Sequence, residues 1–364
     1  MVSVVVGVVE LAVVRSPQWG DGLDGVVGFD AWVRGMHHLS YEHELIRRGL
    51  VGEVMRLTGV VDRPIPTFAV FAAVYLTCAV LLGCLIWQAL AWLDDGSRAV
   101  ATGLLLALPF AAPDLAFELG RYDTLLYVGV LLFVLGRRAP WWAYLLAGLI
   151  GPLIHEVFVV ACVPLLVLSL LPDRRRLVAL LGGCLVSGAV LLAWGDMSSR
   201  SEDQLVAEMD ADVPGYAGLA QDDILLPHKV LFDSPGENLR AVVDSYSPAT
   251  AAHVAAGLVP LAVLLALYRW VRGPVNRAIV GRIAFVSLPL LVLFTVGIDV
   301  VRWVALASLN GLLVMLVDLR DRPPDVVRSV QPRTAAVVLT ATAIAGPVGT
   351  VAAYPLWQEL IGRF

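Results

Sequence analysis

Charged side chains are scarce in this sequence. Only 16% of the 364 residues are charged and 59% are hydrophobic, and the mean hydropathy is +0.79. An ordinary soluble domain has about 25% charged and roughly 45–50% apolar residues. The composition therefore excludes a soluble enzyme, a nucleic-acid-binding protein and a disordered chain. Long apolar runs, without alternation of apolar and polar residues, favour an all-α polytopic membrane protein over a β-barrel.

Cysteines and metal-binding motifs are also few. The four cysteines lie inside apolar runs, without metal-ligand spacing, and are expected to be small buried side chains instead of a disulfide framework. No HExxH, CxxC or glycine-rich nucleotide loop occurs. The sequence therefore assigns no metal site, and it leaves the cofactors unknown because a divalent metal has no clear ligand motif.

The apolar runs predict about ten to eleven membrane segments within a single integral membrane domain, residues 1–364. They lie near 2–14, 67–93, 98–113, 123–136, 141–154, 157–171, 177–194, 249–268, 279–298, 300–317 and 334–354. A full crossing needs about 20 residues, so several segments are short. The first is expected to be a short retained span, because it has no basic region and no cleavage site.

Arginines in the short loops predict the orientation. Fourteen of them fall in alternate loops, which are therefore expected to be cytoplasmic: Arg98, Arg137, Arg138, Arg174, Arg175, Arg176, Arg269, Arg272, Arg277, Arg282, Arg320, Arg322, Arg328 and Arg333. The short loops of the other set hold only Arg121 and Arg302. All six histidines and most carboxylates lie on this second, extracytoplasmic side or at its margin, so any chemistry is expected there.

Two long polar stretches, 15–66 and 195–247, are predicted to be extracytoplasmic loops. Residues 40–58 have the spacing of an amphipathic helix lying in the membrane interface. That helix either only anchors the loop or lets Arg47 and Arg48 contact a lipid phosphate. The acidic loop 195–247 is typical of a solvated surface. The alternatives are a metal site formed by its carboxylates and a lid or specificity element that contacts the acceptor.

The segment PDLAFELGRYD, residues 113–123, concentrates four ionisable groups beside apolar spans. Asp114 and Glu118 are four residues apart, so a helix would place both carboxylates on one face. Arg121 and Asp123 follow closely. Such groups are costly when they face lipid. They either neutralise one another at a helix end or pair a carboxylate base with an arginine that binds phosphate through its planar fork.

The stretch from Ala139 to Pro172 contains only two strongly polar residues, His155 and Glu156, and arginine clusters flank it on both sides. Both ends are therefore predicted to be cytoplasmic. Roughly 33 residues give about 50 Å of helix, short of the roughly 60 Å needed for two full crossings. A short or re-entrant hairpin near 141–171 is expected, with His155 and Glu156 at its apex. Either one of the two binds substrate while the other takes a proton, or His155 is only a hydrogen-bonded core residue.

A fourth polar group, Asp299, Arg302 and Trp303, lies between two apolar spans. Asp299 and Arg302 are three residues apart and are expected either to form a local ion pair or to supply a second phosphate-binding arginine. In the second case the Trp303 indole would stack on a sugar or support the guanidinium.

These patches (YEHELIRRGLVGE, RYD at 121–123, HE at 155–156 and DVVRW at 299–303) resemble bacterial multi-spanning glycosyltransferases of the GT-C class and related polysaccharide polymerases, the O-antigen-polymerase and EpsG-like proteins. The resemblance covers most of the chain as an architecture with short patches. It implies a polyprenyl-phosphate-linked sugar donor, a glycan or lipid acceptor, and a plasma-membrane protein of a bacterium, active on the extracytoplasmic side.

In such families a first-loop carboxylate is often the base, and Asp30 is the best match by position, with Asp21, Asp24, Glu42 and Glu44 as rivals. The adjacent acidic pair of many members is absent here. Asp30, Glu156, His155 and Glu118 are thus the candidate catalytic residues. The candidate ligands of the donor phosphate and sugar are Arg121, Asp123, Arg302, Asp299, Trp303, Arg47 and Arg48. The alternatives are a transporter or flippase for a lipid-linked or anionic solute, and an acyl- or phosphotransferase with His155 as base.

Overall fold

The described part of the chain is helical and holds no strand. The computed structural model describes residues 1–5, 29, 31–42, 45–46, 48–61, 63–136, 139–194, 199–213, 240, 243, 248–273, 277–295, 300–324 and 337. Its longer helices are α4 (Pro64–Ala89), α5 (Asp95–Leu106), α7 (Asp123–Gly136), α8 (Trp141–Ile154), α10 (Arg174–Trp194), α11 (Ser199–Asp212), α15 (Pro248–Arg272), α16 (Arg277–Ser287) and α17 (Val300–Asp321). Shorter elements are α2 (Ala31–His38), α3 (Gly49–Leu57), α6 (Ala112–Phe117), the π-helix η2 (Phe158–Cys162), α9 (Val163–Leu170) and the 3₁₀ helix η3 (Leu288–Thr295).

Three helices are long and apolar enough to cross a membrane, namely α4, α10 and the Arg302–Asp321 part of α17. Shorter apolar helices cover Asp123–Gly136, Trp141–Ile154 and Phe158–Leu170. The all-helical class is therefore confirmed for the described residues, and three helices have the length and apolar composition that the predicted membrane class requires. The full number of spans stays a prediction, and the expected spans near 2–14 and 334–354 fall almost entirely outside the described residues.

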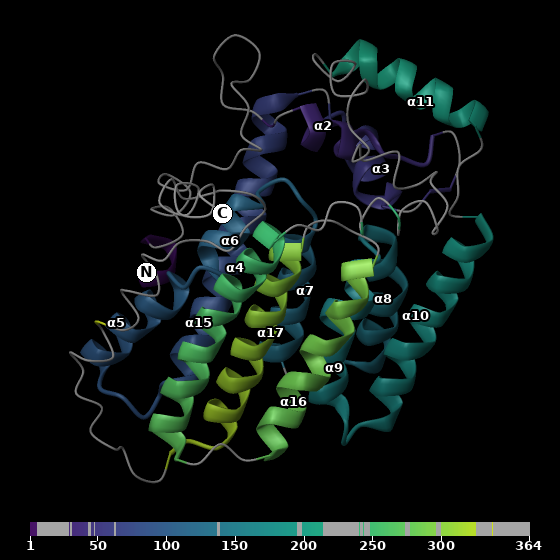
Figure 1. Ribbon diagram of the computed structural model, residues 1–364. Coiled ribbons are helices and arrows are strands. Elements are labelled where there is room, and N and C mark those ends of the chain that lie inside the picture. Colours follow the sequence, from purple (N-terminus) through teal and green to yellow (C-terminus); the bar gives the residue numbers. More distant parts are fainter. Residues whose placement is uncertain are drawn as a thin grey trace.

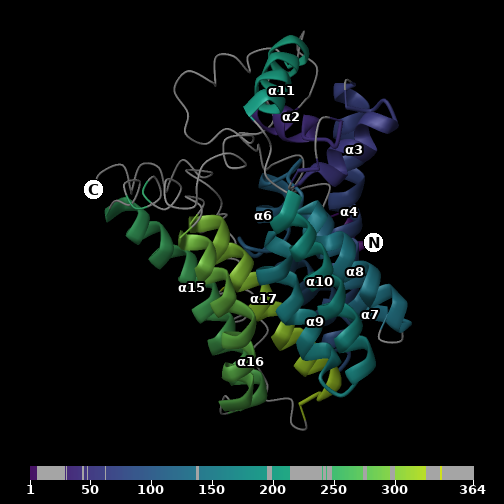
Figure 2. The ribbon, with the colours of Figure 1, turned by 90° about the vertical axis from the view of Figure 1, so that its right-hand side faces the viewer.

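The helices form a bundle with one covered end. Helix α4 packs on both α7 and α17, α15 and α16 pack on α17, and α8 packs along α10. In both ribbon views α2, α3 and α11 lie across one end of these helices (Figures 1 and 2). We call this the capped end. The first turn of α10 and the last turns of α15 and α17 lie at the opposite end (Figure 1).

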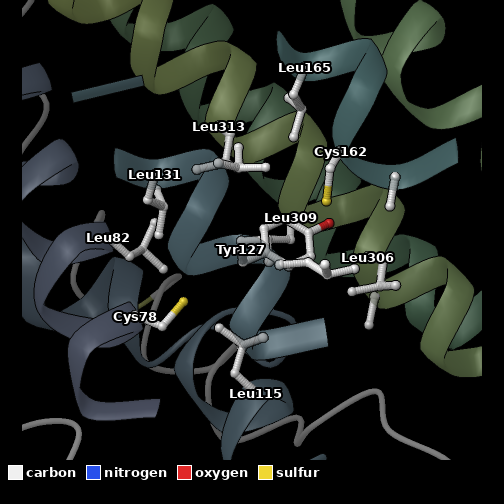
Figure 3. Packing of buried hydrophobic residues seen from close by; sticks show 14 of the residues in the cluster. Cys78, Leu82, Leu115, Tyr127, Leu131, Cys162, Leu165, Leu306, Leu309 and Leu313 are labelled. Atoms are coloured by element: carbon white, nitrogen blue, oxygen red, sulfur yellow. The ribbon is translucent and has the colours of Figure 1, made fainter. Parts of the chain in front are cut away.

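A buried polar contact joins the middle of the bundle. The Tyr127 hydroxyl of α7 donates to the Asn310 side-chain oxygen of α17 at 2.7 Å, inside a cluster of leucines and cysteines (Figure 3). The Asn310 amide in turn donates to the carbonyls of Ala161, 2.9 Å away, and Val286, 3.1 Å away. A π-helix changes the regular α-helical hydrogen-bond pattern, and Asn310 provides a donor for one of its carbonyls. The contact fixes α7, α16, α17 and η2 relative to one another.

Helices α8 and α10 approach closely through glycines. A Cβ atom on Gly148 would lie 2.2 Å from the Leu180 carbonyl oxygen, and one on Gly183 would lie 2.5 Å from that of Leu145. The Ser187 hydroxyl donates to the Leu149 carbonyl at 2.6 Å. Small residues of this kind allow helix backbones to meet in membranes, where van der Waals packing and interhelical hydrogen bonds drive association.

Two sequence expectations are changed by the structure. The helix expected near 40–58 begins only at Gly49, because Arg48 has a left-handed backbone with φ of 63° and turns the chain. Gly52 then lies so close to α2 that a Cβ would meet the Leu39 carbonyl oxygen at 2.0 Å. The loop 195–247 is also not wholly irregular, since α11 covers its first part.

We predict that Gly183→Leu destabilises the protein, whereas Gly182→Leu on the same helix does not. A side chain at 183 must push α8 away, at a cost of about 1–3 kcal/mol or more, while nothing lies within 4 Å of a Cβ at 182. Thermal unfolding of the detergent-solubilised variants measures the difference. Equal melting temperatures for the two variants would contradict the close crossing.

Candidate functional site

A tight turn after α6 carries the polar segment found in the sequence. Gly120 has φ of +98°, and a Cβ there would lie 2.7 Å from Val33 and 2.8 Å from Phe29. Only glycine adopts such a backbone without strain and leaves room for these side chains. The turn therefore depends on Gly120, and it brings Glu118 and Arg121 into the buried part of the protein.

Helix α2 is fastened to this turn by two hydrogen bonds. The His37 Nε2 lies 2.8 Å from the Gly120 carbonyl oxygen, and the Tyr122 hydroxyl donates to the Met36 carbonyl at 3.0 Å. The His37 ring is stacked on Phe71 with centroids 4.5 Å apart. These contacts hold the capped end and the turn together as one unit.

Burial determines the protonation of His37. Desolvation lowers its pKa to about 4 from 6.5, more strongly than the Gly120 hydrogen bond raises it, and His38 and Arg34 lower it further. The ring is therefore neutral at pH 7. Because a carbonyl oxygen only accepts, Nε2 carries the proton. Nδ1 is then an acceptor, and it has no hydrogen-bond partner in the described part of the chain.

Arg302 pairs with Asp123 across the bundle. Its Nε donates to the Asp123 carboxylate at 2.7 Å, and its Nη2 donates to the same oxygen. Both side chains are almost fully buried, and the guanidinium lies over the Trp303 ring, 4.6 Å from the ring centroid. Trp303 therefore supports the guanidinium, one of the two roles expected for it. Asp299, the local partner expected from the sequence, lies outside the described residues.

Arg48 pairs with Glu156 at the break between α8 and η2. Its Nε donates to both carboxylate oxygens at 2.9 Å, and its Nη2 donates to Oε1. His155 adopts an extended backbone that ends α8, and its Nδ1 lies 3.3 Å from Glu156 Oε2. The Val157 backbone N–H points to the same Nδ1 at 3.2 Å. His155 and Glu156, the residues expected at the apex of a hairpin, thus lie beside Arg48 of the first polar stretch, 15–66.

The turn itself contributes a third pair. Arg121 Nε lies 2.7 Å from Glu118 Oε2, and both side chains are buried. Asp114, on α6, is also buried, and its Oδ1 has no hydrogen-bond partner among the described residues. Asp114 interacts electrostatically with Glu118, Asp123, Arg302 and Arg121. The two acids that the sequence places four apart therefore share one charged environment.

The three pairs form one group, which we call the charge cluster: Arg48, Asp114, Glu118, Arg121, Asp123, His155, Glu156 and Arg302. Arg48 interacts electrostatically with both Asp123 and Arg302, and His155 interacts with Asp123. The structure thus brings together candidates from four separate segments of the chain. Three permanent cations and four carboxylates at one place can bind an anion such as a phosphate, provided that it displaces a carboxylate.

Two more candidates, Asp30 and Arg47, lie outside the described residues. Phe29, the neighbour of Asp30, packs against the His37 ring with centroids 5.3 Å apart. In the part of the chain that is described, no group of three or more His, Cys, Asp or Glu side chains is placed to hold a metal ion.

Sequence reasoning did not single out His37 or Tyr122. The sequence offered one signal for each residue. His37 belongs to a histidine doublet at 37–38, and Tyr122 lies between the charged residues Arg121 and Asp123. Their contacts are with residues more than 80 positions away, and periodicity does not reveal such distant partners. The chain matches no protein-family model, no curated protein and no solved structure, so its own geometry carries the functional argument.

We predict that the protein loses stability as the pH falls from about 6.5 to about 4. Because the folded pKa of His37 is lowered, the unfolded chain takes up a proton in this window and the folded chain does not. The expected loss is about 3 kcal/mol from this group. His37→Gln should flatten the profile, measured as melting temperature against pH. An unchanged slope in the variant would show that other groups cause the acid sensitivity.

We also predict strong coupling between Asp123 and Arg302. Asp123→Asn alone removes the carboxylate from a buried guanidinium and should cost about 3–5 kcal/mol. The double variant Asp123→Asn/Arg302→Gln should be more stable than that single variant, because no buried charge is left over. Denaturant unfolding of all variants measures this. Additive losses would mean that the two side chains act independently.

Proposed function

We propose that this protein is a polytopic bacterial plasma-membrane glycosyltransferase or polysaccharide polymerase. It would transfer a sugar from a polyprenyl-phosphate-linked donor to a glycan or lipid acceptor of the cell envelope. The observation that carries the proposal is the charge cluster, in which three arginines and four carboxylates lie together beside the helices of the capped end. All of them are buried except Arg48 and Glu156, which are partly exposed.

Arginines of the charge cluster suit the phosphate of such a donor. A guanidinium binds two phosphate oxygens at once, and the planar forks of Arg48 and Arg302 are presently held by Glu156 and Asp123. We infer that the donor phosphate replaces a carboxylate on these forks, with Arg121 as a further ligand. The cluster would then be neutralised by its own carboxylates until the anionic donor enters.

The carboxylate that the donor phosphate displaces from its arginine becomes the general base for the acceptor hydroxyl. A carboxylate, Glu156 in this proposal, takes the proton of the acceptor hydroxyl, and the hydroxyl oxygen forms the new bond to the anomeric carbon. The bond from that carbon to the phosphate oxygen breaks, and the lipid phosphate leaves with the electron pair, stabilised by the arginines. Glu118 and Asp30 are the alternative bases, and His155 positions Glu156.

Orientation follows from the charges at the other end of the bundle. There Asp318 accepts from the Tyr268 hydroxyl at 2.5 Å and lies 3.6 and 3.7 Å from the guanidinium groups of Arg272 and Arg282. Arginine-rich short loops face the cytoplasm. The capped end would therefore face away from the cytoplasm. On that side of the membrane, lipid-linked sugars are assembled into envelope glycans.

Sugar transfer by the purified protein in lipid nanodiscs tests the proposal. We expect Glu156→Gln and Arg302→Ala to reduce transfer from polyprenyl-phosphate sugars about 100-fold or more, the usual size of a lost base or charge stabiliser. Arg176→Gln is the control, because it removes an arginine paired with Asp173 at the opposite end.

Full transfer by inserted, folded Glu156→Gln and Arg302→Ala variants would contradict the proposed roles. Absence of transfer by the wild-type protein together with solute flux in sealed vesicles would favour the transporter. The described middle of the bundle argues against a polar path, since Tyr127 and Asn310 are satisfied there by each other and by backbone carbonyls.

A further inference from the structure

Helices α8 and α10 begin side by side, at the end of the bundle opposite the capped end (Figure 1). The Arg175 guanidinium lies over the Trp141 ring, 5.0 Å from its centroid, so the first turns of the two helices are in contact. Further along, Ser187 of α10 donates to the Leu149 carbonyl of α8. The contacts advance together along both helices, and the helices are therefore parallel.

Arginines and tryptophans at these two helix starts are exposed. The group, which we call the arginine–tryptophan patch, consists of Trp141, Trp142, Arg174 and Arg175. Trp141 is 39% exposed and Trp142 54%, although both are large aromatic side chains, and Arg174 and Arg175 are exposed as well. Accessible arginines and indoles together form a surface that a ligand can reach without any rearrangement.

The length and burial of α10 place the patch at the membrane surface. The apolar residues 177–194 rise about 27 Å at 1.5 Å per residue, close to the roughly 30 Å of a hydrocarbon core. The buried residues of α10 are Leu180, Gly183 and Ser187, which all lie against α8. The rest of α10 is therefore available to lipid tails. Trp194, at its far end, is also exposed, and tryptophans mark both interfaces of a membrane.

The patch has an excess of positive charge. Arg176 pairs with Asp173 at 3.1 Å, whereas no carboxylate of the described residues lies within ion-pair distance of Arg174 or Arg175. Stacking on Trp141 covers one face of the Arg175 guanidinium, and the N–H groups at the edge of such a plane can still bind two oxygens of a phosphate. The patch therefore suits a phosphate that lies at the level of the interface.

We propose that the arginine–tryptophan patch binds the phosphodiester headgroup of an anionic phospholipid, with its acyl chains along the exposed face of α10. Arginine-rich ends face the cytoplasm, and anionic lipids of the cytoplasmic leaflet attract basic groups at the membrane surface. This site does not rest on the proposed function, because it lies at the other end of α8 from His155 and Glu156.

Native mass spectrometry of the full-length protein in detergent tests the site by lipid titration. The probes are phosphatidylglycerol and phosphatidylcholine with identical acyl chains, and glycerophosphoglycerol as the soluble headgroup alone. We expect the tightest phosphatidylglycerol binding to exceed that of phosphatidylcholine at least fivefold. We also expect no displacement by an equal concentration of glycerophosphoglycerol, because a lipid site also holds the acyl chains.

Variants locate the binding. Arg174→Gln/Arg175→Gln should lower the phosphatidylglycerol affinity about 25-fold, since each basic group at a membrane surface contributes about fivefold. Arg175→Lys keeps the charge but loses the planar fork and should give a smaller loss. The matched control is Arg269→Gln/Arg277→Gln, which removes two exposed arginines at the end of α15 and the start of α16. It should change the affinity less than twofold.

Three results would overturn the lipid site: equal affinity for the two lipids, equal losses in the two double variants, or displacement by the soluble headgroup. Equal losses would mean that the arginines attract anions only through the overall charge of this end. Failure of the proposed function is a separate result, since a protein without sugar transfer should still bind phosphatidylglycerol through Arg174 and Arg175.

Discussion

The ion pair between Arg302 and Asp123 is the contact on which the functional end of the protein depends. It joins the first residue of α7 to the first turn of α17, and both side chains are almost fully buried. A buried charge without a partner is prohibitively costly. The helix ends must therefore meet at this point, and the Arg48–Glu156 and Arg121–Glu118 pairs gather beside it.

Neutralisation within the cluster also explains how so many ionisable groups can coexist in an apolar bundle. Each arginine has a carboxylate within ion-pair distance, so the resting protein buries little net charge. An anionic ligand that takes the place of a carboxylate on an arginine leaves that carboxylate without its partner, so the carboxylate must then reach solvent or take up a proton. The Glu156 side chain, which is 36% exposed, can meet this condition. Structural and functional interpretations of the pairs are therefore compatible.

The capped end is bound to the cluster through unusual backbone. Gly120 has a positive φ, Arg48 is left-handed, and Gly52 lies against the α2 backbone. Such conformations persist where surrounding contacts determine them, and they are frequent at functional sites. Here they hold the His37 ring against the turn that carries Arg121, through its hydrogen bond to the Gly120 carbonyl.

Composition and hydropathy alone determined the helical membrane class, the polar candidates of the 113–123 segment, the His155–Glu156 break and the isolated Arg302. These follow from local chemistry, because charges are rare in apolar segments and stand out. Only the tertiary structure decided their partners: Arg302 binds Asp123, 179 residues away, and Arg48 binds Glu156, 108 residues away. A charge in an apolar interior pairs with the opposite charge that folding brings nearest in space, and distance along the chain does not enter that choice.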